Sequence, residues 1–529
     1  MNVLVIKATK DTLVFSFSGA ENAQKLCIRE QVPTITSDPA RQYGLLNGSL
    51  CSQCDEVGIP RFDNGRDRLF SRFTVWSEDG RQSASGVKYI SDFAPDAHAW
   101  SYPYPQATSK KGTHAHGEDA KTLGVCHATM NVNLCELFSA MPGEDTLPYE
   151  FNGRTFHIKQ AVADNYDKVV MANYHDKINL SLILLTSPRL FGGDNNPLLN
   201  SMAIHPNYDQ EGFISAFNMH TEDGVAYYGA FLDYLASRYM REDAQYGRVT
   251  GFIVGNEVDQ QWIWGNTGET PVEEYIREYT GALRMAWQTA QKYYSEGRAY
   301  ISLTHLFNIS FDPAKPLRFY KGREVLEHLN SHALRDGNFG WNVAYHPYPE
   351  DLRYPDFWND RTTSFDFSTP RITFKNIEVL PAFMAQEHLL YRGEPRRIIF
   401  SEQDFNSYDA YSEELGFAGY CLAYKKIEKQ PTIEAFIFHS YADNKHEFGL
   451  NLGLRRSSDS LDVLGEDKPA WYAFRDMGTD REAAAIAKAI SIVGEHVWNQ
   501  ILNPQVLAGM KDTTREQEFG TAATADEPK

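Results

Sequence analysis

Two glutamates that follow β-rich apolar runs carry the clearest chemical signal in the sequence. Asn256-Glu257 ends the run RVTGFIVGNE (248–257), and Ser401-Glu402 lies in RRIIFSEQD (396–404). If both runs are parallel strands of one sheet, their carboxylates meet at the same edge of it. Two carboxyl groups about 5–5.5 Å apart can cleave a glycosidic bond with retention, one as proton donor and one as nucleophile. Glu257 and Glu402 are therefore candidate catalytic residues.

These two runs belong to a series of eight strand-like segments that alternate with helical ones. The eight are residues 112–116, 124–134, 179–187, 248–257, 299–307, 340–348, 396–404 and 434–442. Among the intervening segments, 224–240 and 273–294 show the apolar spacing of amphipathic helices. Eight strand–helix repeats predict a (β/α)8 TIM barrel of the α/β class, with its active site at the carboxyl ends of the strands. The two glutamates would then follow strands four and seven.

The chain is longer than such a barrel, which needs roughly 250 of its 529 residues. Residues 1–105 contain short β-rich stretches, such as 12–19 and 68–76, and predict an N-terminal β-rich domain that is β-sandwich-like. A Pro- and Tyr-rich joint at 100–112 precedes the barrel. We predict that the barrel covers 106–505 and includes a terminal helix over 483–502, and that the polar tail 506–529 is disordered.

Composition argues against several classes of function. No apolar run approaches the roughly 20 residues that cross a bilayer, so no membrane insertion is expected. The net charge of -19 disfavours nucleic acid and favours a neutral partner such as a carbohydrate. The first residues lack an export signal, which leaves a cytoplasmic or an exported protein open. Cys51-x-x-Cys54 has no second pair, so a zinc site is not favoured over a local disulfide or two ordinary thiols.

The chain resembles the clan A glycoside hydrolases over roughly residues 109–475, because these barrels carry Asn-Glu after strand four and a second Glu after strand seven. The resemblance implies that Glu257 is the acid/base, that Glu402 is the nucleophile and that Asn256 binds the sugar 2-hydroxyl. The strand-six sequence AYHPY adds His346 and Tyr348 as supports for the nucleophile and the substrate. Such a mechanism needs a protonated Glu257 and an ionised Glu402, and no cofactor.

The resemblance is incomplete on strand two. Many clan members carry an Arg near the nucleophile there, whereas this chain has Met130-Asn131-Val132-Asn133. The family within the clan therefore stays open, and sugar identity, linkage, endo or exo action and oligomeric state do not follow from these residues.

Further residues at the strand ends are candidates for substrate binding. Trp262 and Trp264 follow Glu257, and flat rings can stack on the CH faces of sugars. Core packing is the alternative for such rings, but the position of these two favours substrate binding. The polar candidates are Asn133, His305, His439 and Tyr441, with Asn308 and Asp443 beside them. The long loop 188–222 predicts a lid or a wall for subsites, with Arg189, Asn195, Asn196, His205 and His220 as its polar residues.

Two other functions fit parts of the sequence. His114-x-His116 is similar to the HxH motif of the metal-dependent amidohydrolase barrels, and His305, His346 and Asp443 fall near the later ligand positions of that group. The other alternative is a catalytically inactive carbohydrate-binding barrel, against which the presence of both carboxylates counts.

Overall fold

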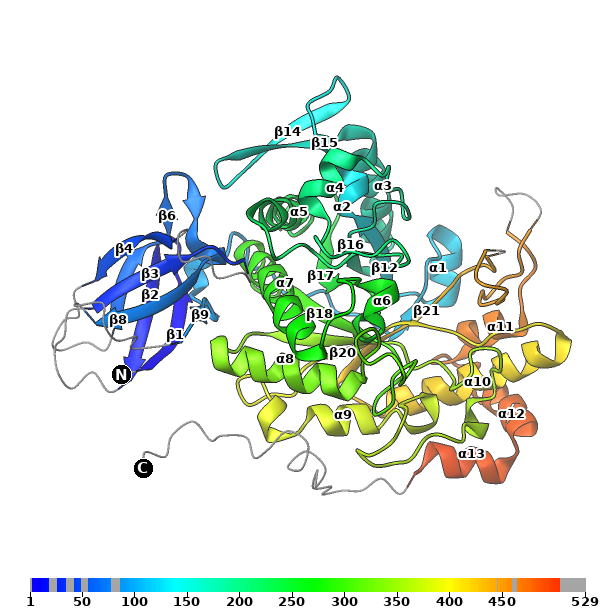
Figure 1. The fold of residues 1–529 in the computed structure, drawn as a ribbon. Helices are drawn as coiled ribbons and strands as arrows, with labels where there is room; N and C mark the ends of the chain where they lie inside the picture. The colour runs from blue at the N-terminus through cyan, green and yellow to red at the C-terminus, as the bar shows by residue number, and fades with distance from the viewer. Residues whose placement is uncertain are drawn as a thin grey trace, which may run out of the picture.

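A closed barrel of eight parallel strands forms the centre of the protein, as the computed structural model shows (Figure 1). The structure describes residues 2–18, 26–34, 42–48, 56–77, 86–444, 446–458 and 464–504. The barrel strands, in their order around it, are β11 (Lys111–Gly112), β12 (His127–Asn133), β16 (Asn179–Leu185), β17 (Val249–Val254), β18 (Arg298–Leu303), β19 (Trp341–Tyr345), β20 (Ile398–Gln403) and β21 (Ile433–Phe438). Each pairs in parallel with the next, and β21 pairs with β11. The predicted α/β barrel is confirmed, and each predicted segment contains barrel-strand residues.

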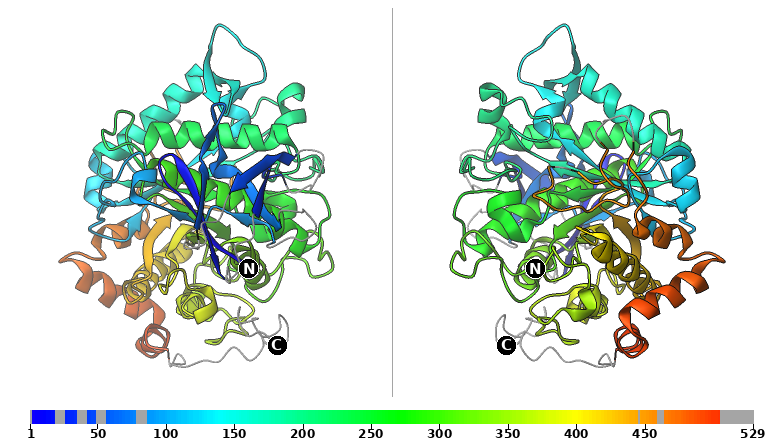
Figure 2. Two further views of the ribbon diagram at one scale, coloured as in Figure 1. Left: turned by 90° about the vertical axis from the view of Figure 1, so that its left-hand side faces the viewer. Right: turned by 90° about the vertical axis from the view of Figure 1, so that its right-hand side faces the viewer.

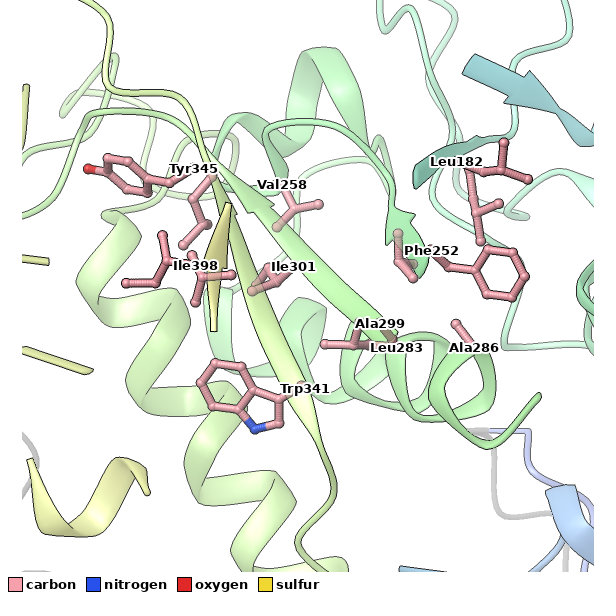
Figure 3. Close-up of a cluster of buried hydrophobic side chains, with 14 of the residues drawn as sticks. Leu182, Phe252, Val258, Leu283, Ala286, Ala299, Ile301, Trp341, Tyr345 and Ile398 are labelled. Atoms are coloured by element: carbon pink, nitrogen blue, oxygen red, sulfur yellow. The ribbon is translucent and has the colours of Figure 1, made fainter. Parts of the chain in front are cut away.

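The barrel strands are buried on both faces, which explains why they appear in the sequence as continuous apolar runs. All seven residues of β16 are buried. Ile253 and Ile399 belong to the cluster that fills the barrel interior. The outer face packs against helices, and Figure 3 shows Phe252 of β17 near Ala286 of the following helix.

Helices surround the barrel and connect its strands. They are α1 (Gly117–Leu123), α2 (Leu134–Leu137), α3 (Gln160–His175), α4 (Pro197–Ala203), α5 (Glu222–Tyr239), α6 (Gln261–Trp264), α7 (Val272–Tyr293), α8 (Gly322–Asp336), α9 (Val379–Met384), α10 (Ala410–Glu428), α11 (Pro469–Asp476), α12 (Glu482–Val493) and α13 (Glu495–Leu502). The two predicted amphipathic helices are α5 and α7. Thr221 caps α5, because its side chain accepts a hydrogen bond from the Gly224 N–H. No helix in the described segments is long and apolar enough to cross a membrane.

Three predicted elements differ from those observed. The first barrel strand is only two residues long, since the chain leaves the sheet after Gly112 and begins α1 at Gly117. The predicted terminal helix is two helices, because Gly494 adopts a φ of 89° between α12 and α13. The predicted strand 68–76 begins as a 3-10 helix at Arg68–Phe70, and only Arg72–Ser77 is strand β8.

Strands also dominate the region before the barrel. One sheet has the order β10 (Asp92–Phe93), β1 (Asn2–Ala8), β2 (Thr12–Ser18) and β5 (Glu56–Pro60), and the other β4 (Gln42–Gly48), β3 (Leu26–Gln31), β8 and β9 (Lys88–Tyr89). Phe15 of the first sheet meets Phe73 of the second edge to face at 5.2 Å, so the sheets pack on each other. Figure 2 shows them in blue on one side of the barrel.

The N-terminal sheets are attached to the outer helices of the barrel. The Gln288 side chain of α7 donates to the Ile90 carbonyl at 2.9 Å, and Lys88 Nζ donates to the Arg335 carbonyl of α8. The domain boundary at 105 stays a prediction. Cys51, Cys54 and the predicted tail 506–529 lie outside the described residues.

A three-stranded sheet and a two-stranded hairpin project from the molecule. The sheet has the order β13 (Phe138–Ser139), β15 (Arg154–Lys159) and β14 (Thr146–Phe151), and it extends beyond the helices at the top of Figure 1. The hairpin of β6 (Phe62–Asp63) and β7 (Arg66–Asp67) belongs to the N-terminal region.

Candidate active site

The two candidate glutamates meet at the carboxyl end of the barrel. Glu402 lies in β20, and Glu257 follows β17. One carboxylate oxygen from each, together with a ring nitrogen of His346, lie within 4.8 Å of one another. Residues far apart in sequence thus form one compact group, as the strand numbers predicted.

A sharp turn after β17 positions Glu257. Gly255 has a φ of 76°, and Glu257 itself has a φ of 41° and a ψ of 56°. This left-handed conformation costs a residue with a Cβ about 1–2 kcal/mol, and such strain concentrates at functional sites. The backbone N–H of Glu257 donates to the Ser302 Oγ of β18 at 2.9 Å, which holds the turn against the neighbouring strand.

His346 contacts residues from both strand ends of the site, Glu257 after β17 and Ser401 in β20. It is buried, its Nδ1 lies 2.9 Å from Glu257 Oε1, and its Nε2 lies 3.1 Å from Ser401 Oγ. Burial alone would lower the pKa of His346, but the nearby charges of Glu402 and Glu257 outweigh it and raise the pKa. The site therefore favours the protonated form of the His346 imidazole.

Glu402 has the electrostatic surroundings of an anion. Burial raises its pKa, but His346, His439 and the Tyr348 hydroxyl, which donates to Glu402 Oε1 at 3.0 Å, together lower it below its usual value. Glu402 is therefore ionised at neutral pH, which a nucleophile requires. The Nε2 of His439 in turn lies 3.5 Å from a carboxylate oxygen of Glu447.

Two further carboxyl groups, which sequence reasoning missed, lie beside the pair. Asp259 and Asp404 are both buried, and each comes two residues after a candidate glutamate. Asp259 accepts hydrogen bonds from the Thr304 N–H at 3.0 Å and from the Thr304 hydroxyl, and burial raises its pKa to about 7. Burial and the charge of Glu402 raise the pKa of Asp404 well above its usual value. The repeated Glu-x-Asp pattern was the signal available in the sequence.

Several of the predicted binding residues do border the pair. Asn256 is half-buried next to Glu257, and its side chain makes no hydrogen bond to another described residue. The Trp264 ring is partly exposed and packs against Phe213 with ring centroids 5.4 Å apart. His305 is buried near His346, and burial lowers its pKa to about 3, so its imidazole is neutral.

Other predicted binding residues have structural contacts instead. Asn133 is buried, and its amide donates to the Ser187, Leu190 and Phe191 carbonyls, so it anchors the loop after β16. Trp262 is also buried, beneath the Arg318 guanidinium at 3.7 Å. The Tyr441 hydroxyl donates to Asp119 of α1. A substrate contact by these three stays a prediction, and their existing contacts do not favour it.

The long loop after β16 is fastened to α7 by a histidine pair. His205 Nε2 lies 3.3 Å from Glu278 Oε2, and His220 Nε2 lies 2.8 Å from the same oxygen. That the loop forms a lid or a wall for subsites stays a prediction. Because His205 Nδ1 accepts a hydrogen bond from the Asn207 N–H, its Nε2 carries the proton and donates to Glu278. That arrangement leaves no lone pair on His205 for a metal ion.

The ligand set of the metal-dependent alternative does not assemble. In the described part of the chain, the groups with metal-ligand spacing are Glu257–His346–Glu402 and His205–His220–Glu278. His116 lies 3.8 Å from Asp176 at the end of α3. Asp443 accepts from Lys468 Nζ at 2.6 Å and belongs to neither group.

Residues 103–501 match the sequence profile of a family described as DUF5722, a family of unknown function. The protein belongs to this family. No curated protein sequence matches this DUF5722 member.

The fold of this DUF5722 protein is similar to that of two β-glucosidases. A hyperthermophilic β-glucosidase from Pyrococcus furiosus is 13% identical, with a TM-score of 0.45 over 71% of this chain and 86% of that one. A family 1 β-glucosidase from Thermotoga maritima is 11% identical, with a TM-score of 0.41 over 68% and 83% of the two chains.

Proposed function

We propose that this DUF5722 protein is a retaining O-glycoside hydrolase that uses Glu257 as acid/base and Glu402 as nucleophile. The separation of the two carboxylates carries the proposal, since their nearest oxygens lie within 4.8 Å. Retaining glycosidases have carboxyl groups about 5–5.5 Å apart, whereas inverting ones need about 6.5–9.5 Å to admit a water molecule. The ionised state of Glu402 supports the same assignment.

The first step breaks the glycosidic bond. Glu402 attacks the anomeric carbon, the bond to the leaving oxygen breaks, and Glu257 protonates that oxygen. Tyr348 already donates to Glu402 Oε1 at 3.0 Å, which leaves the second oxygen for the attack. Asn256, whose amide has no other described partner, is in position to bind a sugar hydroxyl.

The second step releases the sugar. Glu257, now a carboxylate, takes a proton from water as the water oxygen attacks the anomeric carbon, and Glu402 leaves. The sugar departs with its original anomeric configuration, and both carboxyl groups return to their starting states.

The hydrogen bond between Glu257 and His346 determines where the proton for the leaving oxygen is held. The pair holds one transferable proton either as a protonated Glu257 with a neutral imidazole or as a carboxylate with a cationic imidazole. A raised His346 pKa keeps this proton in the site, and the 2.9 Å contact lets it pass to Glu257 as charge develops on the leaving oxygen.

Covalent trapping tests the proposal. A panel of aryl glycosides first identifies the sugar, and the matching 2-deoxy-2-fluoro glycoside then gives an adduct that mass spectrometry locates on the peptide of Glu402. Glu402→Ala and Glu257→Ala lose nearly all activity, and azide restores turnover of an activated aryl glycoside by Glu257→Ala. Glu269→Gln is the matched control, since Glu269 is an exposed glutamate on the same loop as Glu257. An adduct on another residue, or an inverted product, contradicts the mechanism.

A metal-dependent hydrolase is the second candidate, because Glu257, His346 and Glu402 offer three ligand atoms within 4.8 Å. His346 already uses both ring nitrogens for hydrogen bonds, so a metal ion would have to displace one of them. Elemental analysis of the purified protein separates the two functions. A stoichiometric transition metal whose removal abolishes activity supports this second candidate.

A further inference from the structure

Exposed tyrosines gather at the rim of the barrel beside the nucleophile. Tyr354, Tyr408 and Tyr411 are 51%, 57% and 69% exposed. Both segments that carry them begin in the candidate site, because Tyr354 comes six residues after Tyr348 and Tyr408 six residues after Glu402. Six residues span at most about 20 Å even when fully extended. Tyr354 and Tyr408 therefore lie within a few sugar units of the catalytic pair.

The two tyrosine-bearing loops lie side by side. The Asn406 amide donates to the Arg353 carbonyl at 3.0 Å, which joins the loop after β19 to the loop after β20 just before their tyrosines. The Tyr408 phenol also interacts electrostatically with Tyr354 and Tyr411. Desolvation first, and then the nearby Asp409, Tyr354, Asp356 and Tyr411, raise its pKa. The three phenols thus form one surface.

This tyrosine surface has a rigid base. Phe405, three residues before Tyr408, is buried, and its ring packs against Phe357 at 6.0 Å and Phe374 at 5.4 Å. Tyr411 lies in the first turn of α10, where Asp409 and Ser412 cap the helix reciprocally. A surface ordered in advance loses little conformational entropy when it binds a ligand.

Aromatic rings also lie across the barrel mouth, near the proton donor. Trp264 follows β17 and contacts Phe213, which follows β16, while strands six and seven carry the tyrosines. Phe448 is 74% exposed, and its ring is nearly parallel to that of Phe213 at 6.4 Å between centroids. Trp264 therefore follows the same strand as Glu257, the proton donor of the proposed mechanism, whereas Tyr408 follows the strand of Glu402.

We propose that Tyr354, Tyr408 and Tyr411 bind a neutral polysaccharide, which runs across the catalytic pair toward Trp264 and is cleaved within the chain. Tyrosine suits sugars because its ring covers their CH faces while its hydroxyl forms hydrogen bonds. The neighbouring Asp356 and Asp409 and the net charge of -19 disfavour a polyanion. Internal cleavage rests on the proposed function, whereas binding at the tyrosines does not.

Binding is tested in the Glu402→Gln background, in which the proposed hydrolysis is blocked. The probes are four soluble neutral polysaccharides, namely xyloglucan, mixed-linkage β-glucan, arabinoxylan and galactomannan, with polygalacturonate as the charged comparison. Affinity electrophoresis and calorimetry compare Tyr408→Ala, Tyr411→Ala and Tyr354→Ala with the control Tyr472→Ala, an exposed tyrosine on α11. We expect one neutral polymer to bind and each rim variant to weaken it about tenfold, in line with the apolar area that one ring covers.

Tyr408→Ala could weaken binding either by removing the stacking ring or by disturbing the fold. The conservative variant Tyr408→Phe distinguishes these causes, because it keeps the ring and is expected to retain most of the affinity. In the active protein, the rim variants lower kcat/KM for the polymer about tenfold and leave turnover of a short aryl glycoside unchanged. The viscosity of the polymer falls before many reducing ends appear, which is the mark of internal cleavage.

Several results overturn the inference. They are a Glu402→Gln protein that binds none of the polymers, rim variants that bind as well as Tyr472→Ala, and rim variants that change the oligomeric mass instead of polymer affinity. Loss of the proposed function is distinguishable from these results. Polymer binding that depends on the tyrosines in a protein that hydrolyses nothing supports the surface and refutes the hydrolase.

Discussion

Replacing Asp259 with Asn is expected to stabilise the protein more as the pH rises. Asp259 is fully buried, and burial raises its pKa from 3.8 to about 7. In the folded state the carboxyl group thus holds its proton over a pH range in which the unfolded chain has released it. Asn has nearly the same shape, carries no ionisable group and can still accept the hydrogen bond from the Thr304 N–H.

The sign and size of the effect follow from proton linkage. Between pH 4 and pH 7 the folded state binds more protons at this site than the unfolded state, so stability falls as pH rises and the loss is complete above pH 7. A pKa shift of about three units corresponds to about 4 kcal/mol, since each unit corresponds to about 1.4 kcal/mol. About 2.5 kcal/mol of this stability is lost between pH 5 and pH 8.

Urea unfolding at pH 5 and pH 8 measures the difference. The free energy of unfolding of Asp259→Asn, relative to that of the parent, should be greater at pH 8 than at pH 5 by about 2.5 kcal/mol. Asp243→Asn is the matched control, because Asp243 is exposed and its hydrogen bond with Arg241 lowers its pKa, so it titrates below this range. Equal pH dependence in Asp259→Asn and the parent would refute the reasoning that burial keeps this carboxyl protonated.

Three other changes have definite expected outcomes. Tyr348→Phe removes the hydrogen bond to the Glu402 carboxylate, which should lower kcat/KM on the identified glycoside about 10- to 100-fold with an unchanged circular dichroism spectrum. His220→Gln should destabilise the protein more at pH 5.5 than at pH 9 in urea unfolding, since the Glu278 hydrogen bond raises the pKa of His220 and the stabilisation is lost as pH rises through that value. Lys468→Met should lower the free energy of unfolding by about 3–5 kcal/mol, because Asp443 is left buried without its cation, and adding Asp443→Asn should recover part of that loss.

Sequence periodicity predicted the barrel well because buried parallel strands are continuous apolar runs. β16 and β17 illustrate this, since each is buried throughout. The order of these runs also placed Glu257 and Glu402 together, because the carboxyl ends of all eight strands share one rim. The first strand was predicted too long, since the short run after Gly112 gives no sign of where the chain leaves the sheet.

Side-chain contacts were harder to predict than strand positions. Trp262 and Trp264 are two residues apart on one loop, but the first lies beneath Arg318 and the second faces Phe213. Which ring is covered depends on residues more than fifty positions away, and local sequence carries no such information. Asp259 was missed for a similar reason, because its raised pKa depends on burial that only the folded barrel creates.

Asn406 also affects how this site can be altered. Its amide donates to the Arg353 carbonyl at 3.0 Å, and its oxygen accepts from the Asn451 N–H at 2.8 Å. One side chain therefore joins the loops after β19, β20 and β21. Grafting a single loop from a relative would break these hydrogen bonds of Asn406. Substrate specificity is therefore best exchanged by moving the three loops together. Substitutions within the three loops should also show strong epistasis.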